Sequence, residues 1–388
     1  MNLKITLSII LILILDVVNS QTVINFIDLP NMNFQRGLIS TSSNSNSLFV
    51  CHGFSPTVSF TTEIEKYDII NQQWTVFSNS TIGKRYASSE VVGNNLYIFN
   101  GITSTSYNEK LEKVDLQTGN ITFLTDNPYP VRSAGNCVWN NNIYFFGGKN
   151  SSGYSNKLVK YNVALDQWTL LADMQVGRET RGEVVDGKIY VIGGYNGSVS
   201  SRIDAYNIQT NTWEHLLNMP VGISAHSTAV YDRKIWIIGD YTNQTQIGYY
   251  DIDLNEYVSC ISQNMIGRRH FGAEIVNNNL YIMGGNQSSD ASSALNSLQY
   301  TDISTVSVYE DEIKLIKIYP NPSFDYLSIS SPEPIKEVRI LDLQGKIILK
   351  KDNIKHPNNL NISKIKSGTY FVTIKFDKFL ISKRIIKK

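Results

Sequence analysis

The sequence predicts an all-β protein that consists of an array of six repeated β-sheet units followed by a small, separate β-sandwich. Two observations carry this prediction. A short apolar run that ends in a residue pair containing one or two glycines recurs six times, and alternating apolar strands fill residues 314–388. With 388 residues, of which 42% are apolar and 11% aromatic, the chain is long enough to bury a core in each part.

The first twenty residues are typical of a cleaved secretory signal peptide. A single early cation, Lys4, precedes an uncharged run over residues 5–15 and a small polar exit. This run is too short to cross a bilayer as a helix, which needs about 20 apolar residues. We therefore expect a signal peptide over residues 1–20, an exported chain that begins near Gln21, and no transmembrane segment.

The repeat is defined by the second residue of the glycine pair, which recurs every 45–48 residues. An aromatic residue stands four positions earlier in every copy. Hairpin-turn pairs such as Asn141-Asn142 and Asp186-Gly187 precede it in four copies, so each unit is expected to open with a β-hairpin. Further along, an aromatic residue and a tryptophan recur seven residues apart, as at Tyr161 and Trp168. The register positions are Gly53, Gly101, Gly148, Gly194, Asp240 and Gly285.

The period, the glycine pair and the spaced Tyr and Trp together resemble the kelch repeat over residues 23–305. In that family each repeat is one four-stranded blade, so the resemblance implies a six-bladed kelch-type β-propeller over residues 21–305. The last repeat lacks its tryptophan strand, whereas the N-terminal segment matches that strand, with Phe26 at the place of Trp168. We expect residues 23–28 to close the last blade.

The pattern and the charge change after a linker over residues 306–313. Residues 314–388 contain 16 Lys and Arg against 6 Asp and Glu, whereas residues 1–313 contain 19 against 28. Alternating apolar residues with Gln-Gly and Asp-Lys turns predict a β-sandwich. This segment resembles the type A C-terminal sorting domain of the type nine secretion system of Bacteroidetes. The matching residues include Tyr319, Pro320, Asn321, Pro322, Asp325, Leu327, Leu343, Gly345, Lys346, Gly368, Tyr370, Lys387 and Lys388.

The resemblance implies passage across both membranes, usually followed by removal of the tail. The secretion machinery is therefore the expected partner of this domain, and the cell surface or the medium is the expected location. A basic segment also suits nucleic acid. These lysines, however, are spread along alternating strands of an exported protein, so no nucleic-acid partner is expected.

Arginines near the start of each innermost strand are the first candidate ligand-binding residues. Most stand sixteen residues before the glycine register, and we expect them to ring one mouth of the central channel. A ring of guanidinium groups suits a carboxylate or a sulfated sugar. Alternatively, each arginine ties its blade to carbonyl groups of a neighbouring loop. The candidates, with two inner-strand histidines, are Arg36, Arg85, Arg132, Arg178, Arg269, His226 and His270.

Three carboxylates, Glu90, Glu183 and Glu274, stand five residues after that position in repeats two, four and six. Arg181 shares a strand face with Glu183 because the two are separated by one residue. Such a set is a candidate for acid and base catalysis, although a solvent-filled channel also carries carboxylates without a reaction. The kelch family includes a sialic-acid mutarotase that would use Glu and Arg at the channel mouth.

Neither a phosphate-binding loop nor a nucleophile elbow occurs, and no metal-ligand spacing is evident, so neither a cofactor nor a metal is expected. Three widely spaced cysteines, Cys51, Cys137 and Cys260, are expected to be buried thiols. Most kelch propellers are interaction platforms. The leading hypothesis is therefore an exported, non-catalytic binding module for an extracellular protein or glycan. The alternative is a carbohydrate-active enzyme such as a sialic-acid-type mutarotase.

Overall fold

The computed structural model describes residues 22–304 except 80–81, and residues 316–388 except 355–357 and 377–379. The signal peptide expected over residues 1–20 and the linker expected over residues 306–313 lie outside the described residues. The chain divides into two compact units, one formed by Val23–Ser304 and one that contains the C-terminal residues. Within the described parts, no helix is long and apolar enough to span a membrane.

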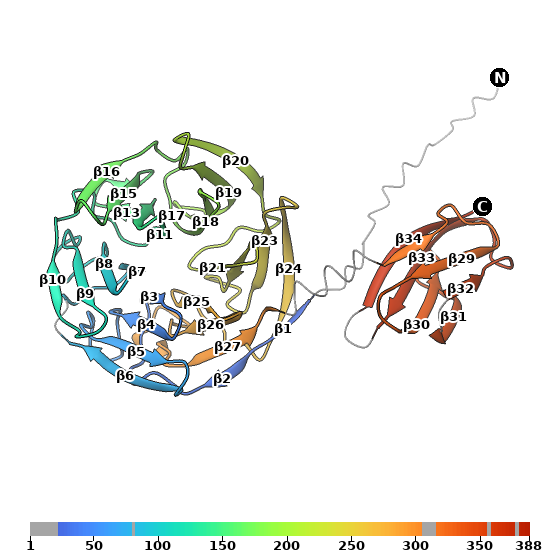
Figure 1. The fold of residues 1–388 in the computed structure, drawn as a ribbon, viewed down its shortest axis with the longest axis horizontal. Coiled ribbons are helices and arrows are strands. Elements are labelled where there is room, and N and C mark those ends of the chain that lie inside the picture. Colours follow the sequence, from blue (N-terminus) through green and yellow to red (C-terminus); the bar gives the residue numbers. More distant parts are fainter. Residues whose placement is uncertain (1–21, 80–81, 305–315, 355–357, 377–379) are drawn as a thin grey trace, which may run out of the picture. The chain divides into compact units, whose positions relative to one another are not determined.

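Six β-sheets arranged around a central axis form the propeller (Figure 1). The innermost strands, which line the channel, are β3 (Ser40–Ser43), β7 (Ser88–Val92), β11 (Gly135–Trp139), β17 (Glu179–Val185), β21 (Ser227–Tyr231) and β25 (Gly272–Val276). The second strands are β4 (Ser47–Cys51), β8 (Asn95–Phe99), β12 (Asn142–Phe146), β18 (Lys188–Tyr195), β22 (Lys234–Ile238) and β26 (Asn279–Met283).

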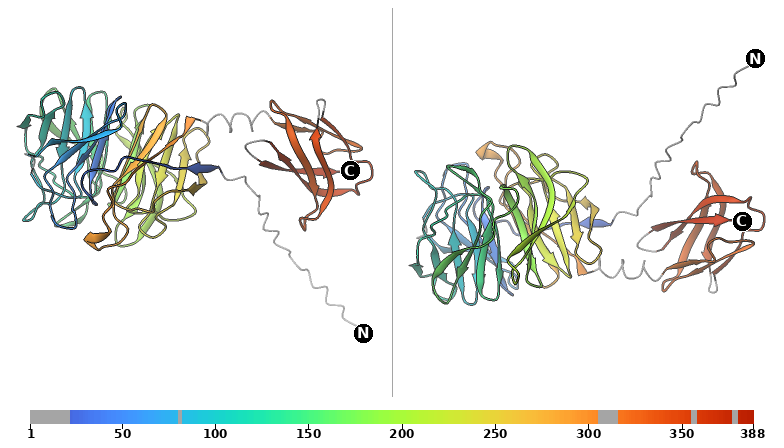
Figure 2. Two further views of the ribbon diagram at one scale, coloured as in Figure 1. Left: turned by 90° about the horizontal axis from the view of Figure 1, so that it is seen from below. Right: turned by 90° about the horizontal axis from the view of Figure 1, so that it is seen from above.

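The third strands are β5 (Ile64–Asp68), β9 (Glu112–Asp115), β15 (Leu158–Asn162), β19 (Val199–Asn207), β23 (Ile247–Asp251) and β27 (Leu298–Asp302). The outer strands of blades one to five are β6 (Gln73–Ser78), β10 (Ile121–Phe123), β16 (Gln167–Leu170), β20 (Thr212–Asn218) and β24 (Glu256–Gln263). The loops carry a short hairpin, β13 (Lys149–Asn150) with β14 (Gly153–Tyr154), and the single turn η1 (Ala291–Ser293). Figure 2 shows the propeller from two sides, with loops at both ends of the strands.

The inner hairpins turn through pairs of residues that adopt positive φ. Asp186 and Gly187 have φ of 50° and 73°, and Asn277 and Asn278 have 49° and 65°. Asn, Asp and Gly tolerate this conformation, which a two-residue hairpin turn requires. The sequence places the Asp186-Gly187 turn correctly, but it places the Asn141-Asn142 turn one residue too late. Three asparagines follow one another there, and the positive φ angles of 48° and 56° belong to Asn140 and Asn141.

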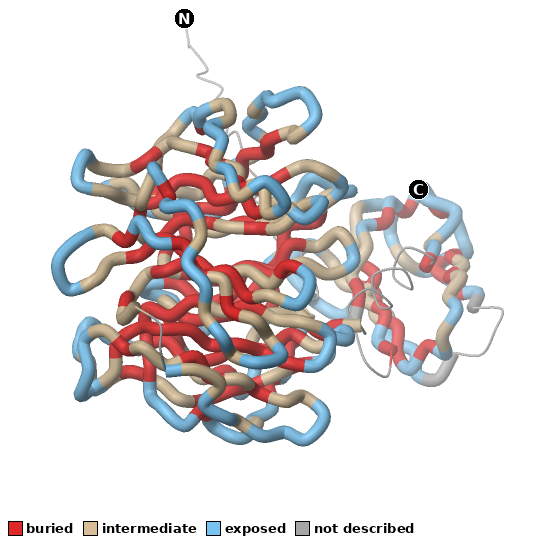
Figure 3. Tube along the Cα trace, turned by 60° about the vertical axis from the view of Figure 1, so that its left-hand side comes forward, coloured by how far each residue is buried: buried red, intermediate tan, exposed pale blue. Residues whose placement is uncertain are grey.

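The repeated aromatic residues and glycines pack the blades against one another. All six aromatic residues before the glycine register are buried, with Trp236 completely so. A Cβ on Gly194 would lie 2.1 Å from the Glu179 carbonyl oxygen, so the close approach of the two backbones requires glycine there. Figure 3 shows the buried residues running along the strands and the exposed ones in the loops.

The tryptophans tie each blade to the segment that leaves the blade before it. Trp74 Nε1 donates to the Pro30 carbonyl at 2.8 Å, and Trp168 Nε1 donates to the Thr125 carbonyl at 3.0 Å. Trp213 Nε1 makes the same bond at 2.8 Å to a carbonyl of the previous blade. Tryptophan suits this place because its ring packs on the blade while its N–H finds a carbonyl partner in the preceding blade.

The N-terminal segment joins two blades. Strand β2 (Ile27–Leu29) pairs antiparallel with β27 and supplies the outer strand of blade six. Strand β1 (Val23–Asn25) pairs parallel with β24 and adds a fifth strand to blade five. The sequence-based assignment of residues 23–28 to the last blade is therefore wrong for Val23–Asn25. The chain crosses between the blades at Phe26, which is 2% exposed and whose backbone N–H donates to the Gln263 carbonyl at 2.9 Å.

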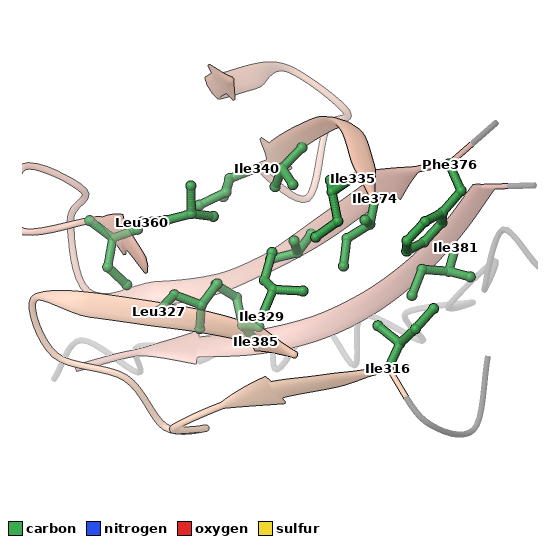
Figure 4. Close-up of a cluster of buried hydrophobic side chains, with 13 residues drawn as sticks. Ile316, Leu327, Ile329, Ile335, Ile340, Leu360, Ile374, Phe376, Ile381 and Ile385 are labelled. Atoms are coloured by element: carbon green, nitrogen blue, oxygen red, sulfur yellow. The ribbon is translucent and has the colours of Figure 1, made fainter. Parts of the chain in front are cut away.

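The C-terminal unit consists of two sheets that enclose one apolar core (Figure 4). One sheet contains β28 (Lys317–Tyr319), β29 (Tyr326–Ser330) and β32 (Asn358–Asn361). The other contains β31 (Ile347–Ile354), β30 (Ile335–Leu341), β33 (Gly368–Lys375) and β34 (Leu380–Lys387). Apolar side chains from both sheets meet between them, among them Leu327, Ile340 and Ile374, as the alternating sequence pattern predicts.

Several residues of the sorting motif hold the end of the chain. The Asn321 side chain accepts a hydrogen bond from the Ile386 N–H at 2.9 Å and donates one to the Arg384 carbonyl at 3.1 Å. The Lys388 N–H donates to the Ser323 carbonyl, and Ser323 forms a β-bridge with Lys387.

The other motif residues lie at turns and strand ends. Gly345 adopts a φ of 80° in the turn between β30 and β31, and Gly368 begins β33. The Tyr370 hydroxyl donates to the Lys366 carbonyl at 2.9 Å, and the Asp325 carbonyl accepts from the Ile362 N–H. Tyr319 remains 52% exposed, next to Pro320 and ahead of Pro322.

Candidate functional site

The arginines expected at the mouth occupy two different positions. Arg85, Arg132 and Arg269 each form a β-bridge to the residue just after the glycine register of their own blade. Arg36 and Arg178 stand one position earlier, where their carbonyls accept a bond from the register glycine of the preceding blade. Both side chains are completely buried. The expectation that they ring the mouth is therefore not met for these two.

The buried position carries an ion pair in three blades. Arg36 contacts Glu65, Lys84 contacts Glu112, and Arg178 contacts Asp204, each between the innermost and third strands of one blade. Arg178 Nη2 lies 2.7 Å from Asp204 Oδ2, and its Nε donates to the Gly193 carbonyl at 2.7 Å. These geometries fit the structural role that the sequence left open as an alternative for the arginines.

A shorter entry turn in blade four explains the misplacement. Arg181 pairs with Ile192 in blade four as Gly135 pairs with Phe146 in blade three. Arg181 stands three positions after Arg178, whereas Gly135 stands four positions after the equivalent Val131. The ladder of blade four accordingly shifts register between Glu179 and Arg181. Arg178 stands sixteen residues before its register glycine, as Arg85 and Arg132 do, but it occupies the buried position and not the position of those two arginines.

The same shift places a large cation where the other blades have small residues. The positions equivalent to Arg181 are Ser40, Ser88, Gly135, Ser227 and Gly272. Arg181 Nη1 donates to the Ala134 carbonyl of blade three at 3.1 Å. It also donates to the carbonyl of Thr180, the residue that precedes Arg181, at 2.8 Å. Burial lowers the pKa of the Arg181 guanidinium, and nearby Glu179 opposes that effect. Arg181 is thus held by carbonyl groups inside the channel.

A cavity of about 390 Å³ lies at the mouth where the innermost strands begin. Its rim is aromatic: Tyr241 is 50% exposed and Tyr195 is 37% exposed, and Tyr86 lines the wall. The guanidinium of Arg132 lies 5.2 Å from the centre of the Tyr86 ring, and that of Arg269 lies 3.9 Å from the centre of the Tyr241 ring. The mouth therefore combines aromatic rings with cations stacked on them.

Positive charge is in excess around this mouth cavity. Arg132 and Arg181 line it, and Arg269 stands behind Tyr241. Within the described part of the chain, the single lining carboxylate is that of Glu179, whose Oε1 lies 3.2 Å from Arg132 Nε in an ion pair that reaches across blades. Burial raises the pKa of Glu179, and Arg132 partly offsets this rise.

The two histidines of the mouth are neutral at pH 7. His226 is 2% exposed, and burial, helped by Arg181, lowers its pKa to about 3. Burial and then the charges of Arg181, Arg269 and Arg132 lower the pKa of His270 to about 3 as well. His270 packs edge-on against Tyr86 and Tyr241, with ring centres 5.6 and 6.4 Å apart. Both imidazoles keep one donor and one acceptor for hydrogen bonding.

Deeper in the channel, a cavity of about 260 Å³ holds the three predicted carboxylates. Each accepts a hydrogen bond from the next blade: Glu90 from Asn136 at 2.8 Å and Glu183 from Thr228 at 2.7 Å. Glu274 accepts from Thr41 and Ser43, both at 2.8 Å. In blade one the position equivalent to the glutamates is occupied by Ser42, and its neighbour Thr41 is a hydrogen-bond partner of Glu274.

Burial is the main cause that raises the pKa of these carboxyl groups. It raises the pKa of Glu90 and Glu183 to about 8 and that of Glu274 to about 7. The hydrogen bonds that each carboxylate accepts lower its pKa and so oppose part of this rise. Repulsion from the other carboxylates adds to the rise at Glu90 and Glu183. Around neutral pH the set therefore holds some protons, which is the condition for acid and base chemistry.

His52 and the three cysteines line neither cavity, although Cys137 is buried close to Glu90 and Glu183. His52 is completely buried and adopts a φ of 59° next to the glycine register. Cys51, Cys137 and Cys260 are buried free thiols. Within the described residues, no group of three His, Cys, Asp or Glu side chains is arranged to hold a metal ion.

Comparison with known proteins identifies both parts of the chain. The model of the KLHDC2/KLHL20/DRC7 Kelch-repeats domain matches residues 39–240, which is more than half of the chain. The protein therefore belongs to the kelch-repeat family, and its all-β propeller fold is as predicted. A secretion system C-terminal sorting domain matches residues 317–388, which indicates export by the type nine secretion system to the cell surface or medium.

Individual relatives match only part of the propeller. The chain is 37% identical to Kelch-like protein 38 of Danio rerio over 103 residues, which are 26% of this chain and 17% of that protein. It is 35% identical over 82 residues to Kelch repeat and BTB domain-containing protein 2 of Ectromelia virus, covering 20% of this chain and 15% of the relative. It is 33% identical over 79 residues to N-acetylneuraminate epimerase of Shigella sonnei, covering 19% of this chain and 21% of that relative. The matches thus span less than a quarter of these relatives.

The aromatic rim is the part of the site that the sequence analysis missed. Tyr195 and Tyr241 each directly follow a register position, Gly194 and Asp240. Because the chain leaves the second strand toward the mouth at that point, a tyrosine there was a usable signal. The structure also brings Arg132 and Arg181 together with His226 and His270 at one cavity.

Proposed function

We propose that this protein is an exported binding module that binds an acidic glycan at the mouth of its propeller. The observation that carries the proposal is the mouth cavity itself, where two lining arginines and a third behind Tyr241 face a single carboxylate. An anionic ligand would restore the balance of charge, because a guanidinium group binds carboxylate and sulfate through paired hydrogen bonds.

The rim supports a sugar as the carrier of that charge. Tyr86, Tyr195 and Tyr241 offer flat apolar faces with hydroxyl groups at their edges, and a sugar ring likewise has apolar faces and a polar circumference. The neutral imidazoles of His226 and His270 add donors and acceptors. A cavity of about 390 Å³ lies within the range of small-molecule sites.

A glycan array tests this proposal directly. The secreted protein should bind glycans with uronic acid, sialic acid or sulfate groups, and should bind their neutral counterparts at least about tenfold more weakly. Binding that ignores the acidic group would contradict the proposal. If no glycan on the array binds and the protein binds only protein ligands, the ligand of the module is a protein and the proposal is contradicted.

An acidic-sugar mutarotase is the second candidate. It is favoured by Arg181 and Glu183, which stand two residues apart in the channel, with the pKa of Glu183 raised by burial to about 8. The Shigella sonnei relative is an N-acetylneuraminate epimerase by name. Nuclear magnetic resonance exchange between sugar anomers would detect the reaction. Glu183→Gln should abolish exchange, and exchange at the wild-type rate in that variant would exclude this role of Glu183.

The route of export is the other part of the proposal. We expect a signal peptide over residues 1–20, a Bacteroidetes host, removal of the tail after transport, and attachment to the surface or release. The match to a sorting domain supports this route. Deletion of residues 314–388 should leave the propeller inside the cell envelope. Equal amounts of the truncated and full-length proteins in the medium would contradict it.

A further inference from the structure

The channel carries opposite charges on the two sides of one residue. Arg181 lines both cavities. The mouth cavity has an excess of guanidinium groups, whereas the deeper cavity is lined by Glu90, Glu183 and Glu274 and, among the residues that the structure describes, by no cation other than Arg181. A ligand that reaches from the mouth into the channel therefore meets positive groups first and carboxyl groups next.

An unsatisfied hydroxyl group indicates that the deeper cavity is suited to a polar ligand. Ser40 lines this cavity and is 8% exposed, and its Oγ has no hydrogen-bond partner in the described structure. Leaving a buried polar group without a partner costs free energy, which a ligand hydroxyl would recover. The observation is independent of the carboxylates, because Ser40 belongs to blade one and the three glutamates belong to blades two, four and six.

The three carboxylates line the same cavity. They come from alternate blades around the axis, and each is fixed by hydrogen bonds from the next blade. Those bonds use one oxygen of Glu90 and one of Glu183, and among the described residues the second oxygen of each accepts no hydrogen bond. An ammonium group has three donors and no acceptor, which fits a site of acceptors on three sides.

The spacing of the charges selects the ligand class. Arg181 and Glu183 lie two residues apart on β17, so their backbone positions are about 6.6 Å apart. The guanidinium group of Arg181 lies further toward the mouth cavity, where it donates to the Ala134 and Thr180 carbonyls. An α-amino acid holds its two charges too close together to reach both. A sugar ring between a carboxylate and an ammonium group provides a suitable separation. We infer that the channel binds a zwitterionic amino sugar acid, with its carboxylate at Arg181 and its ammonium group among Glu90, Glu183 and Glu274.

This inference rests on the proposed function for its carboxylate end and adds the channel as a second subsite. The titratable or charged groups around that subsite are Glu90 on β7, Cys137 on β11, Arg181 and Glu183 on β17, and Glu274 on β25. Strands β3 and β21 contribute neutral groups to the lining. Because burial raises the pKa of the three carboxyl groups, an ammonium ion that binds there should displace protons into the buffer.

Calorimetric titration of the secreted protein with four matched sugars tests the inference. The probes are 2-amino-2-deoxyglucuronic acid, its N-acetyl derivative, glucosamine and glucose. We expect the zwitterion to bind at least about tenfold more tightly than the N-acetyl acid, with proton release seen as an enthalpy that varies with the buffer. Equal affinities of the two acids would overturn the inference and leave the proposed function standing. Failure of both acids to bind would overturn both.

A variant locates the ammonium site. Glu183→Gln should reduce the affinity ratio of the zwitterion to the N-acetyl acid to about one third of the wild-type value or less, and should lower the number of protons released. Glu214→Gln is the matched control, because Glu214 lies on the outer strand β20 with a 53% exposed side chain. A ratio that is unchanged in Glu183→Gln, or equally reduced in the control, would place the ammonium group elsewhere and contradict the inference.

Discussion

Arg36 and Lys157 each contact a carboxylate, but their surroundings predict very different contributions to stability. The side chains of Arg36 and Glu65 are both completely buried, whereas those of Lys157 and Asp173 are 43% and 42% exposed. Removing one partner of a buried pair leaves an uncompensated charge in the interior. An exposed pair is screened by water and salt.

We therefore expect Arg36→Ala to reduce the free energy of unfolding by about 3–5 kcal/mol. Lys157→Ala should change it by less than about 1 kcal/mol. Denaturant unfolding of the two variants measures both values. Similar small losses in both would show that the buried Arg36 side chain does not support the blade.

Single residues also mark the limit of prediction from sequence. The buried aromatic residues and the glycine register were predictable because close packing and positive φ restrict those positions to few residue types. The buried position of Arg178 was not predictable, because the residue types in blade four do not show that its entry turn is one residue shorter. The same deletion puts Arg181 into the channel, so the missed detail belongs to the candidate site.

At the level of elements, β1 and β2 link blade five to blade six through one continuous segment. Ile24 of β1 is 3% exposed, whereas its neighbour Val23 is 54% exposed, because successive side chains of a strand point to opposite faces. Pairing with β24 also covers backbone groups at the outer edge of blade five. The sequence predicted the strand of blade six from its match to the tryptophan strand. It did not predict β1, which has no counterpart in the other repeats.

Replacing one residue of β1 tests this link. Ile24→Asp should lower the melting temperature by several degrees, because it places a charge in an apolar, buried site. Val23→Asp introduces the same charge one residue away on the exposed face and should have little effect. If both variants melt like the wild type, the pairing of β1 with β24 does not stabilise the ring.

At the level of the whole molecule, the six blades together build a channel whose carboxyl groups are costly to ionise. Glu90, Glu183 and Glu274 have an ordinary pKa of 4.5 that burial raises to about 8, 8 and 7 in the folded protein. A group that binds its proton more tightly when folded stabilises the protein below its unfolded pKa, and this stabilisation is lost as the pH rises through the folded value.

The wild-type protein should therefore lose stability between about pH 4.5 and pH 8 relative to a variant with all three glutamates replaced by glutamine. The difference should reach about 1–2 kcal/mol per carboxyl group, because water in the channel screens part of the effect. Denaturant unfolding at pH 5 and pH 8.5 measures it. Parallel pH profiles of the two proteins would show that the channel does not raise the pKa of these carboxyl groups.

The measurement that tests the central claim most directly is a titration of the wild type and Arg181→Ser with a uronic acid. Serine stands at the equivalent position in three other blades, so the substitution should leave the fold and the melting temperature intact. Arg233→Ser, at an exposed turn with a 41% exposed side chain, is the control. A mouth site for acidic sugars predicts at least about a tenfold loss of affinity in Arg181→Ser and none in Arg233→Ser. Equal affinity in all three proteins, or no binding by the wild type, would contradict it.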